Sequence, residues 1–340
     1  MGRTKPGSYT RTWTAPGYTV DEAGKVAGGT YRPDGPNNWG RWGEDDQRGT
    51  QNLIGPEQRI AAAGLVRTGN VFSLALPIDA AGPRWPTRPA PLRWTLMAGS
   101  DLITGSPYAE EQPDFQWNDD MFQMPTQGST QWDALAHVAV EDTMYNGFWA
   151  GEVTAQGGAR TLGIDSQRES FVGRGVLLDL ARHQGLDACP DGQIVHEDML
   201  QACADAQGVE LRAGDILLVR TGYLAKWWGI SGSEDQMEYF LASPGLSAST
   251  AGWLHEHGVS ALAADTIAVE SMTPENPDDR VYPLHVVCLV DLGLPLGEFW
   301  HLDDLARDCA EDGRFEFLLV APPLRIPGAL GSPINPIALK

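Results

Sequence analysis

Arg174-Gly-Val-Leu-Leu-Asp-Leu-Ala181 is an apolar run in which polar and apolar residues do not alternate. Such a run is typical of a strand that is covered on both faces of a sheet. Asp215-Ile-Leu-Leu-Val-Arg220 has the same character, and residues 196–206 between the two runs have the spacing of an amphipathic helix. A buried strand, a helix and a second buried strand in this order predict an α/β fold with a mixed, largely buried sheet.

The same alternation continues toward the C-terminus. Residues 248–257 predict a helix that Gly258 stops, and residues 259–264 predict the strand that follows it. The other predicted elements are a helix at 55–65, a strand at 71–76, and apolar runs at 283–291 and 315–321.

Residues 1–60 differ from the rest of the chain, because they are rich in Gly, Pro, Trp and charge and show little periodicity. Trp13, Trp39 and Trp42 need apolar surface to pack against, so we expect an extended arm that wraps the body or a second subunit. No internal repeat, low-complexity tract or Gly-rich linker divides residues 61–340. We therefore expect a single domain over residues 61–340, preceded by the arm.

Composition and charge exclude several classes of protein. The chain has 340 residues, with 24 Lys and Arg against 45 Asp and Glu, and a formal net charge of −21. A surface of this charge repels nucleic acid and anionic membranes, because binding either of them needs Lys and Arg. An apolar fraction of 42% and 12 Trp argue against a disordered chain. No apolar run approaches the roughly 18 residues of a membrane-spanning helix.

The cysteines and the first residues bear on the cellular compartment. Cys189, Cys203, Cys288 and Cys309 lie far apart and form no Cys-x-x-Cys pair, which indicates reduced thiols rather than a disulfide framework or a zinc knuckle. The basic residues that follow Met1 do not lead into the apolar core of a secretory signal. We therefore expect a cytoplasmic protein that binds neither nucleic acid nor a membrane.

Gln127-Gly-Ser-Thr-Gln-Trp-Asp-Ala-Leu-Ala-His137 concentrates the side chains that can carry chemistry. It holds two carboxamides, one carboxylate and one imidazole, and its Gly, Ser and Thr permit a tight backbone. Spacings of four, two and four residues separate Gln127, Gln131, Asp133 and His137, so a loop that turns into a helix can bring them together. On these residues alone two interpretations stay open, a functional site and a hydrogen-bonded structural cluster.

These eleven residues resemble the His-x-Gly-Thr-His-x-Asp-x-Pro-x-His signature of the cyclase family, which includes bacterial kynurenine formamidase and isatin hydrolase. Thr130, Asp133 and His137 match the signature. Glutamine replaces its first two histidines, as in the Gln-x-x-x-Gln-x-Asp variant of a branch that resembles trans-dienelactone hydrolase. The departures from the signature are Gln127, Ser129, Gln131 and Leu135.

Shorter stretches extend the resemblance over residues 39–336. In the family, a histidine and a downstream glutamate complete the metal site, and here they would be His285 and Glu298, thirteen residues apart. The stretches that carry the resemblance are residues 39–50, Arg220-Thr-Gly222, Leu284-His-Val-Val-Cys-Leu289, Gly297-Glu298 and residues 331–336.

The resemblance implies the kynurenine-formamidase-like swivelling β/β/α fold, assembled as a homodimer or a larger homo-oligomer. It also implies one or two divalent ions, Zn²⁺ or Mn²⁺, which suit a mixed set of carboxylate, imidazole and amide ligands. The implied catalytic residues are His137 and Glu298. The implied metal ligands are Gln127, Gln131, Asp133, His285 and Glu298. The residues expected to line the substrate pocket are Thr130, Trp132, Arg220 and Asp265.

These residues predict a metal-dependent hydrolase that opens a lactone or a cyclic or aryl amide in a small-molecule substrate. Metal-bound hydroxide would attack the carbonyl, and His137 would carry the proton. Two alternatives stay open. One is a cyclase, dehydratase or isomerase of a small-molecule pathway on the same fold. The other is a metal-free pseudo-hydrolase that binds a ligand. In this alternative, the replacement of two histidines by glutamine has abolished metal binding.

Overall fold

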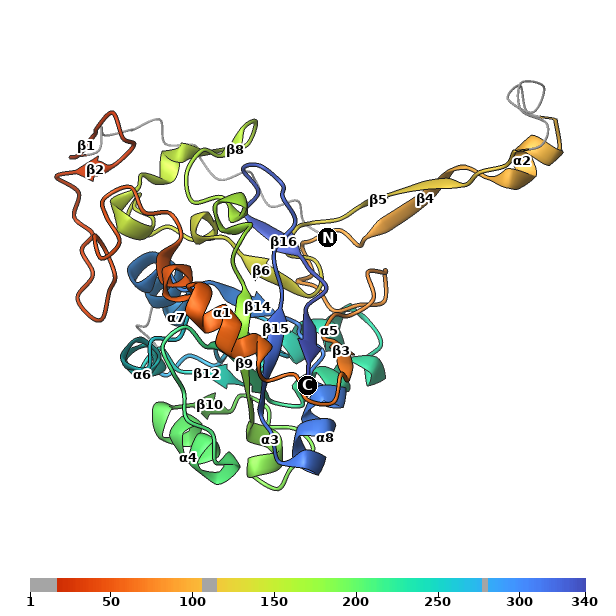
Figure 1. Ribbon diagram of the computed structural model, residues 1–340. Coiled ribbons are helices and arrows are strands. Elements are labelled where there is room, and N and C mark those ends of the chain that lie inside the picture. Colours follow the sequence, from red (N-terminus) through yellow and green to blue (C-terminus); the bar gives the residue numbers. More distant parts are fainter. Residues whose placement is uncertain (1–16, 106–114, 277–280) are drawn as a thin grey trace, which may run out of the picture.

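The computed structural model describes residues 17–105, 115–276 and 281–340. Its centre is a nine-stranded mixed sheet, whose strands run through the middle of the molecule in Figure 1. Four neighbouring strands, β14, β13, β11 and β9, are parallel, and the other pairings are antiparallel. The spatial order is β16 (Gly331–Pro333), β6 (Gln131–Asp133), β14 (Leu296–Glu298), β13 (Ala261–Ala264), β11 (Ile216–Arg220), β9 (Val172–Asp179), β15 (Glu316–Val320), β17 (Ile337–Leu339) and β3 (Val71–Ser73).

The central strands β9, β11 and β13 are buried on both faces. In β11, Leu217 and Val219 belong to one apolar cluster, while Ile216 and Leu218 belong to a second cluster on the opposite face. The crossover from β9 to β11 contains α4 (Glu197–Gln207), and the crossover from β11 to β13 contains α6 (Thr250–Glu256). The predicted buried strands and the two helices between them are therefore confirmed.

Some predicted elements differ in extent. The strand predicted at 71–76 is confined to β3, because Leu76 donates its backbone N–H to Thr130 Oγ1 instead of to a neighbouring strand. The apolar run at 283–291 is helical and forms α7 (Pro283–His285) and η8 (Val286–Leu292), which ends at Gly293 with a φ of +62°. The run at 315–321 forms β15.

Shorter elements surround the sheet. None of the helices in the described ranges is long and apolar enough to cross a membrane. The elements not yet named are β1 (Thr19–Val20), β2 (Val26–Ala27), η1 (Gly49–Leu53), α1 (Pro56–Ala63), η3 (Leu135–His137), η4 (Tyr145–Gly147), η5 (Ala150–Glu152), β7 (Val153–Thr154), β8 (Gly158–Ala159), η6 (Ile164–Gln167), α3 (Leu180–His183), β10 (Ile194–Val195), η7 (Tyr223–Gly229), α5 (Ser233–Leu241), β12 (Gly245–Leu246) and α8 (Asp303–Asp312).

The described part of the predicted N-terminal arm packs against its own chain. Asn38 donates its side-chain N–H to the carbonyl oxygen of Leu292 at 2.8 Å, and the Trp39 indole donates to the carbonyl oxygen of Val290 at 2.7 Å. Trp13 lies outside the described residues. The boundary predicted after residue 60 falls inside α1, and the division into an arm and one domain stays a prediction.

A second feature projects from the body (Figure 1). It is an antiparallel two-stranded ribbon of β4 (Leu92–Met97) and β5 (Asp119–Gln123), with α2 (Gly99–Ile103) at its far end. Every strand residue of the ribbon is exposed except Met97, which is half-buried. Within the described part of the chain, the ribbon therefore stands away from the apolar core.

Candidate metal centre

The register between β6 and β14 gathers polar side chains on one face of the sheet. Glu298 lies opposite Gln131, and Gly297 lies opposite Trp132. Because successive side chains of a strand point to opposite faces, Gln131, Asp133 and Glu298 share one face and Trp132 points to the other. Residues 167 positions apart in sequence thereby become neighbours, and Gln131 Nε2 donates to Glu298 Oε2 at 2.9 Å.

His285 reaches the same group from the end of α7. The buried carboxylate of Glu270 accepts the backbone N–H groups of Leu284 and His285, both at 3.0 Å, and also contacts His285 Nδ1 at 2.5 Å. These three contacts orient the imidazole ring. Its Nε2 lies 3.9 Å from Asp133 Oδ2 and 3.7 Å from Glu298 Oε1.

The resulting cluster fits a divalent cation. One ligand atom from each of Asp133, His285 and Glu298 lies within 4.8 Å of the others, and all three residues are buried. Two buried oxygens of the cluster, Asp133 Oδ2 and Gln131 Oε1, have no hydrogen-bond partner. A buried oxygen without a partner is costly, so both atoms favour a bound cation. Two carboxylates, an imidazole and an amide oxygen suit Zn²⁺ or Mn²⁺, and Glu270 supplies the carboxylate that often supports a ligating histidine.

The buried charges of the cluster shift one another's pKa. Burial raises the pKa of Asp133 to about 6, against the opposing positive charges of His137, His285 and Arg88. Burial would lower the pKa of His285, but its contacts with Glu270 and Glu298 outweigh burial and raise the pKa to about 10. Burial likewise opposes ionisation of Glu298, and the His285 contact overcomes it and lowers the pKa of Glu298. His285 therefore carries the counter-charge that a bound cation would replace.

The backbone around the cluster is held in the left-handed region at residues other than glycine. Ala268 and Val269 have φ of +66° and +61°, while Tyr282 and Phe299 have φ of +57° and +56°. Valine avoids this region because its Cβ is branched, so the local conformation is strained. The strained turn places the backbone N–H of Ala268 3.0 Å from Glu298 Oε1.

The cluster opens into a cavity of about 560 Å³. His137, the last residue of η3, lies in its wall. A second cavity of about 380 Å³ adjoins it, shares Trp85, Val281 and Tyr282 with it, and reaches Glu270. We call the larger cavity the cleft. Its lining includes Trp85, Arg88, His137, Tyr282, His285 and Glu298.

Gln127 has its amide engaged outside the cluster. Its Oε1 accepts from Thr126 Oγ1 at 2.8 Å, and its Nε2 donates to the Leu330 carbonyl oxygen at 2.9 Å. The same nitrogen lies 3.5 Å from His137 Nδ1. The structure therefore places Gln127 beside His137, and its predicted role as a metal ligand stays a prediction.

Two of the residues expected to line the substrate pocket pack inside the protein. Trp132 is fully buried and stacks on Phe171, with ring centroids 4.6 Å apart. Thr130 Oγ1 donates to the Phe299 carbonyl oxygen at 2.6 Å and accepts the backbone N–H of Leu76 at 2.9 Å. Both side chains are satisfied by the fold, and neither lines the cleft among its described residues.

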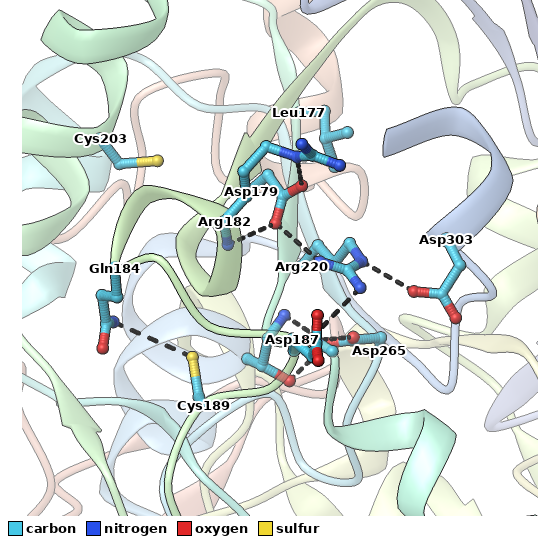
Figure 2. A network of polar contacts seen from close by, with 12 residues as sticks. Leu177, Asp179, Arg182, Gln184, Asp187, Cys189, Cys203, Arg220, Asp265 and Asp303 are labelled. Carbon is cyan, nitrogen blue, oxygen red and sulfur yellow. Dashed lines mark hydrogen bonds and ion pairs between the residues drawn. The ribbon is translucent and has the colours of Figure 1, made fainter. Parts of the chain in front are cut away.

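Arg220 and Asp265 belong to a polar network at the carboxyl ends of β9, β11 and β13 (Figure 2). Arg220 pairs with Asp179 at 2.8 Å and with Asp303 at 2.7 Å. Asp265 accepts the backbone N–H groups of Thr221 and Gly222, at 2.8 Å and 2.7 Å. These contacts join neighbouring strand ends, and neither residue is found in the lining of the cleft.

The sequence interpretation missed Glu270 and Arg88. Glu270 follows the apolar residues 267–269, and a carboxylate at the end of a buried run is a signal that could have indicated it. Arg88 lies in the Pro-rich residues 83–91, where no periodic pattern indicates which side chain faces a site.

Comparison with known proteins places the chain in a family. The model of the family described as "Putative cyclase" matches residues 72–271. A solved structure described as a novel cyclase is 42% identical, with a TM-score of 0.83 over 90% of this chain and 100% of that one. No curated protein matches the chain.

Two solved isatin hydrolases share the fold at lower identity. Isatin hydrolase A from Ralstonia solanacearum is 20% identical, with a TM-score of 0.56 over 84% of this chain and 98% of that one. Isatin hydrolase A from Labrenzia aggregata is 18% identical, with a TM-score of 0.55 over 83% of this chain and 97% of that one. The predicted fold class and family resemblance are confirmed, and this chain belongs to the cyclase family.

Proposed function

We propose that this protein is a metal-dependent hydrolase that opens a lactone or a cyclic or aryl amide. The observation that carries the proposal is the buried cluster of Asp133, His285 and Glu298, whose ligand atoms lie within 4.8 Å of one another beside an open cleft. The fold shared with the isatin hydrolases supports the same class of reaction, since their names describe the hydrolysis of isatin. The substrate is then a small molecule that fits the cleft.

The residues of the cluster would share the binding of one divalent cation. Asp133, His285 and Glu298 would hold Zn²⁺ or Mn²⁺, and Gln131 Oε1 is a fourth candidate ligand. A cation bound there polarises a carbonyl and lowers the pKa of water near it. Glu270 holds the imidazole of His285 in place, while the Gln131 N–H group separates the carboxylates of Asp133 and Glu298.

His137 is the proton carrier in this proposal. It lines the cleft together with Glu298, and an imidazole can both accept and donate a proton. The Gln127 amide has its orientation set by Thr126 and Leu330, so it presents N–H to His137 Nδ1. In this arrangement Nδ1 would accept the amide N–H, and the proton of the neutral ring would lie on Nε2.

The first test is the metal content of the purified protein. We expect about one Zn²⁺ or Mn²⁺ per chain in the wild type, loss of the metal and of activity in Asp133→Ala, and metal without full activity in His137→Ala. Elemental mass spectrometry on protein purified without chelators measures the content, and Asp303→Ala is a control carboxylate outside the cleft. Absence of metal from the wild type after incubation with both ions would favour the metal-free ligand-binding alternative.

A second candidate function is ring closure on the same site. The family description and the 42% identical novel cyclase favour it. The two reactions differ in where an oxygen atom comes from, because hydrolysis transfers one oxygen from water to the product and cyclisation does not. Turnover in oxygen-18 water, followed by mass spectrometry of the product, separates them. Product without the label would contradict the hydrolase proposal.

A further inference from the structure

Arg88 stands in the wall of the cleft with His137, His285 and Glu298. Among the described residues of that wall, it is the only Lys or Arg. The whole chain carries a net charge of −21, and the carboxylates of Glu141 and Glu298 also line the cleft. A single guanidinium in such a surrounding is a local centre of positive charge.

The backbone holds Arg88 in this position. A turn brings its backbone N–H to the Trp85 carbonyl oxygen at 2.9 Å, with Pro86 at the position where its fixed φ favours a turn. Arg88 Nη1 then donates to the carbonyl oxygen of Gln127 at 2.7 Å. The guanidinium is therefore anchored at one N–H group, on the side of the cleft where Gln127 also meets His137.

The remaining donors of Arg88 distinguish it from the structural arginines of the fold. Arg174 pairs with the carboxylates of Asp215 and Glu316, and Arg220 pairs with two carboxylates in the network of Figure 2. Within the described residues, the side chain of Arg88 donates one hydrogen bond, to the Gln127 carbonyl oxygen, and forms no ion pair. A guanidinium has about five N–H donors in a planar fork, which matches the two oxygens of a carboxylate.

Two aromatic side chains line the same cleft as this donor group. Trp85, three residues before Arg88, and Tyr282, next to α7, line both the cleft and the adjoining cavity. Aromatic side chains in the lining favour a flat ligand that can pack against their rings. We propose that Arg88 binds a carboxylate of the substrate, so that the substrates of this cleft are planar molecules bearing a carboxylate besides the ester or amide that reacts. This inference rests on the proposed function, because it takes the cleft as the substrate site.

The test compares two probes that differ only in charge, phenylacetate and phenylacetamide. Isothermal titration calorimetry on the full chain measures both affinities, in Zn²⁺-loaded and in metal-free protein. We expect the wild type to bind phenylacetate more tightly by roughly tenfold or more, because a charge-assisted pair of hydrogen bonds is lost with the amide. Arg88→Gln should abolish this preference and leave the affinity for phenylacetamide unchanged.

Two further variants control the test. Arg84 lies in the same loop, and its guanidinium donates to the carbonyl oxygens of Ala80 and Gly82. The control variant Arg84→Gln should therefore keep the preference for phenylacetate. Arg88→Lys keeps the positive charge but lacks the planar fork of N–H donors, so it should keep part of the preference for phenylacetate. This result would exclude loss of folding as the reason why Arg88→Gln loses the preference. A preference that survives in Arg88→Gln, or is absent from the wild type, overturns the proposal.

The two protein states separate this inference from the proposed function. The preference for phenylacetate depends on Arg88, so we expect it in the metal-free protein as well as in the Zn²⁺-loaded protein. Failure to bind either Zn²⁺ or Mn²⁺, with an intact, Arg88-dependent preference, would refute the hydrolase proposal alone. A preference that requires Zn²⁺ and ignores Arg88 would place the carboxylate on the metal and refute the subsite.

Discussion

The two glutamines that replace histidine in the signature have different surroundings. Gln131 lies inside the metal cluster, where its Nε2 donates to Glu298 and, at 3.3 Å, to Asp133. Gln127 Nε2 instead donates to the Leu330 carbonyl oxygen and lies 3.5 Å from His137 Nδ1. In the proposed function, residues with the same side chain would therefore serve the cation in one case and the proton carrier in the other.

Substitution of each glutamine separates these roles. Gln131→Ala removes the N–H group between two buried carboxylates and a candidate ligand oxygen, so we expect the affinity for Zn²⁺ to fall roughly 10- to 100-fold. Gln127→Ala should leave the affinity unchanged and slow turnover. Calorimetric Zn²⁺ titration of both variants tests this expectation. An equal loss of affinity in the two variants would show that both glutamines act on the metal.

Glu270 makes a testable contribution to the metal site although it is not among the predicted ligands. Its carboxylate accepts the N–H groups at the start of α7 and contacts His285 Nδ1. Glu270→Gln keeps the shape and removes the charge that supports the imidazole. We expect the affinity for Zn²⁺ to fall roughly 10- to 100-fold by titration, and the exposed Glu311→Gln to have no effect. Unchanged affinity in Glu270→Gln would remove Glu270 from the site.

At the scale of the elements, β14 is the strand on which the site depends. It lies between β13 and β6, and it carries Glu298 on the face of the cluster. On its other face, Gly297 packs under Trp132 and Trp300, where a Cβ would come within 2.7 Å of atoms of both rings. The glycine lets the indoles cover the strand closely.

Gly297→Ala tests the packing of β14. The added methyl group must displace two buried indoles, so we expect the free energy of unfolding to fall by about 1–3 kcal/mol in urea denaturation. Gly252→Ala is the matched control, because nothing lies within 4 Å of its added Cβ in α6. We expect the control to be neutral or more stable. An unchanged stability in Gly297→Ala would mean that the indoles move without cost.

At the scale of the whole molecule, the projecting ribbon bears on the predicted homo-oligomer. Cross-strand pairing places Trp94 beside Met121 and Arg93 beside Phe122. One face of the ribbon thus carries Leu92, Trp94 and Met121, which are 51%, 43% and 46% exposed, and Leu96, 62% exposed, lies at the irregularity between Thr95 and Met97. Arg93 pairs with Asp120 on the other face, at 2.9 Å. An isolated two-stranded ribbon is marginal in water, so this apolar face favours an association that covers it.

We predict that the protein is a homodimer or larger and that the apolar face of the ribbon contributes to its interface. The double substitution Trp94→Glu with Leu96→Glu should convert it to monomer, while Thr95→Glu on the opposite face should not. Size-exclusion chromatography with light scattering measures the mass against the 36.8 kDa of one chain. A wild type of one-chain mass would contradict the prediction.

Local patterns were sufficient for the core strands, the helices between them and the identity of the signature residues. The apolar runs at β9 and β11 were predicted correctly as strands, because burial on both faces of the sheet requires an uninterrupted apolar sequence. The signature segment also led to the right family, since its matching residues Thr130, Asp133 and His137 lie in one short stretch of sequence. Patterns do not determine which residues line the pocket, because the side of the sheet to which Trp132 points depends on the register of its strand.

Sequence therefore settles what is local in this protein, namely which segments are buried strands and which residues carry the chemistry of the family. Tertiary structure alone decides that Glu298 lies across from Gln131, that Glu270 orients His285, and that the ribbon stands away from the core. The physical reason is that these relations join distant segments. These relations are set by strand register, by contacts at helix ends and by the packing of the indoles. None of these features produces a periodic pattern in the sequence.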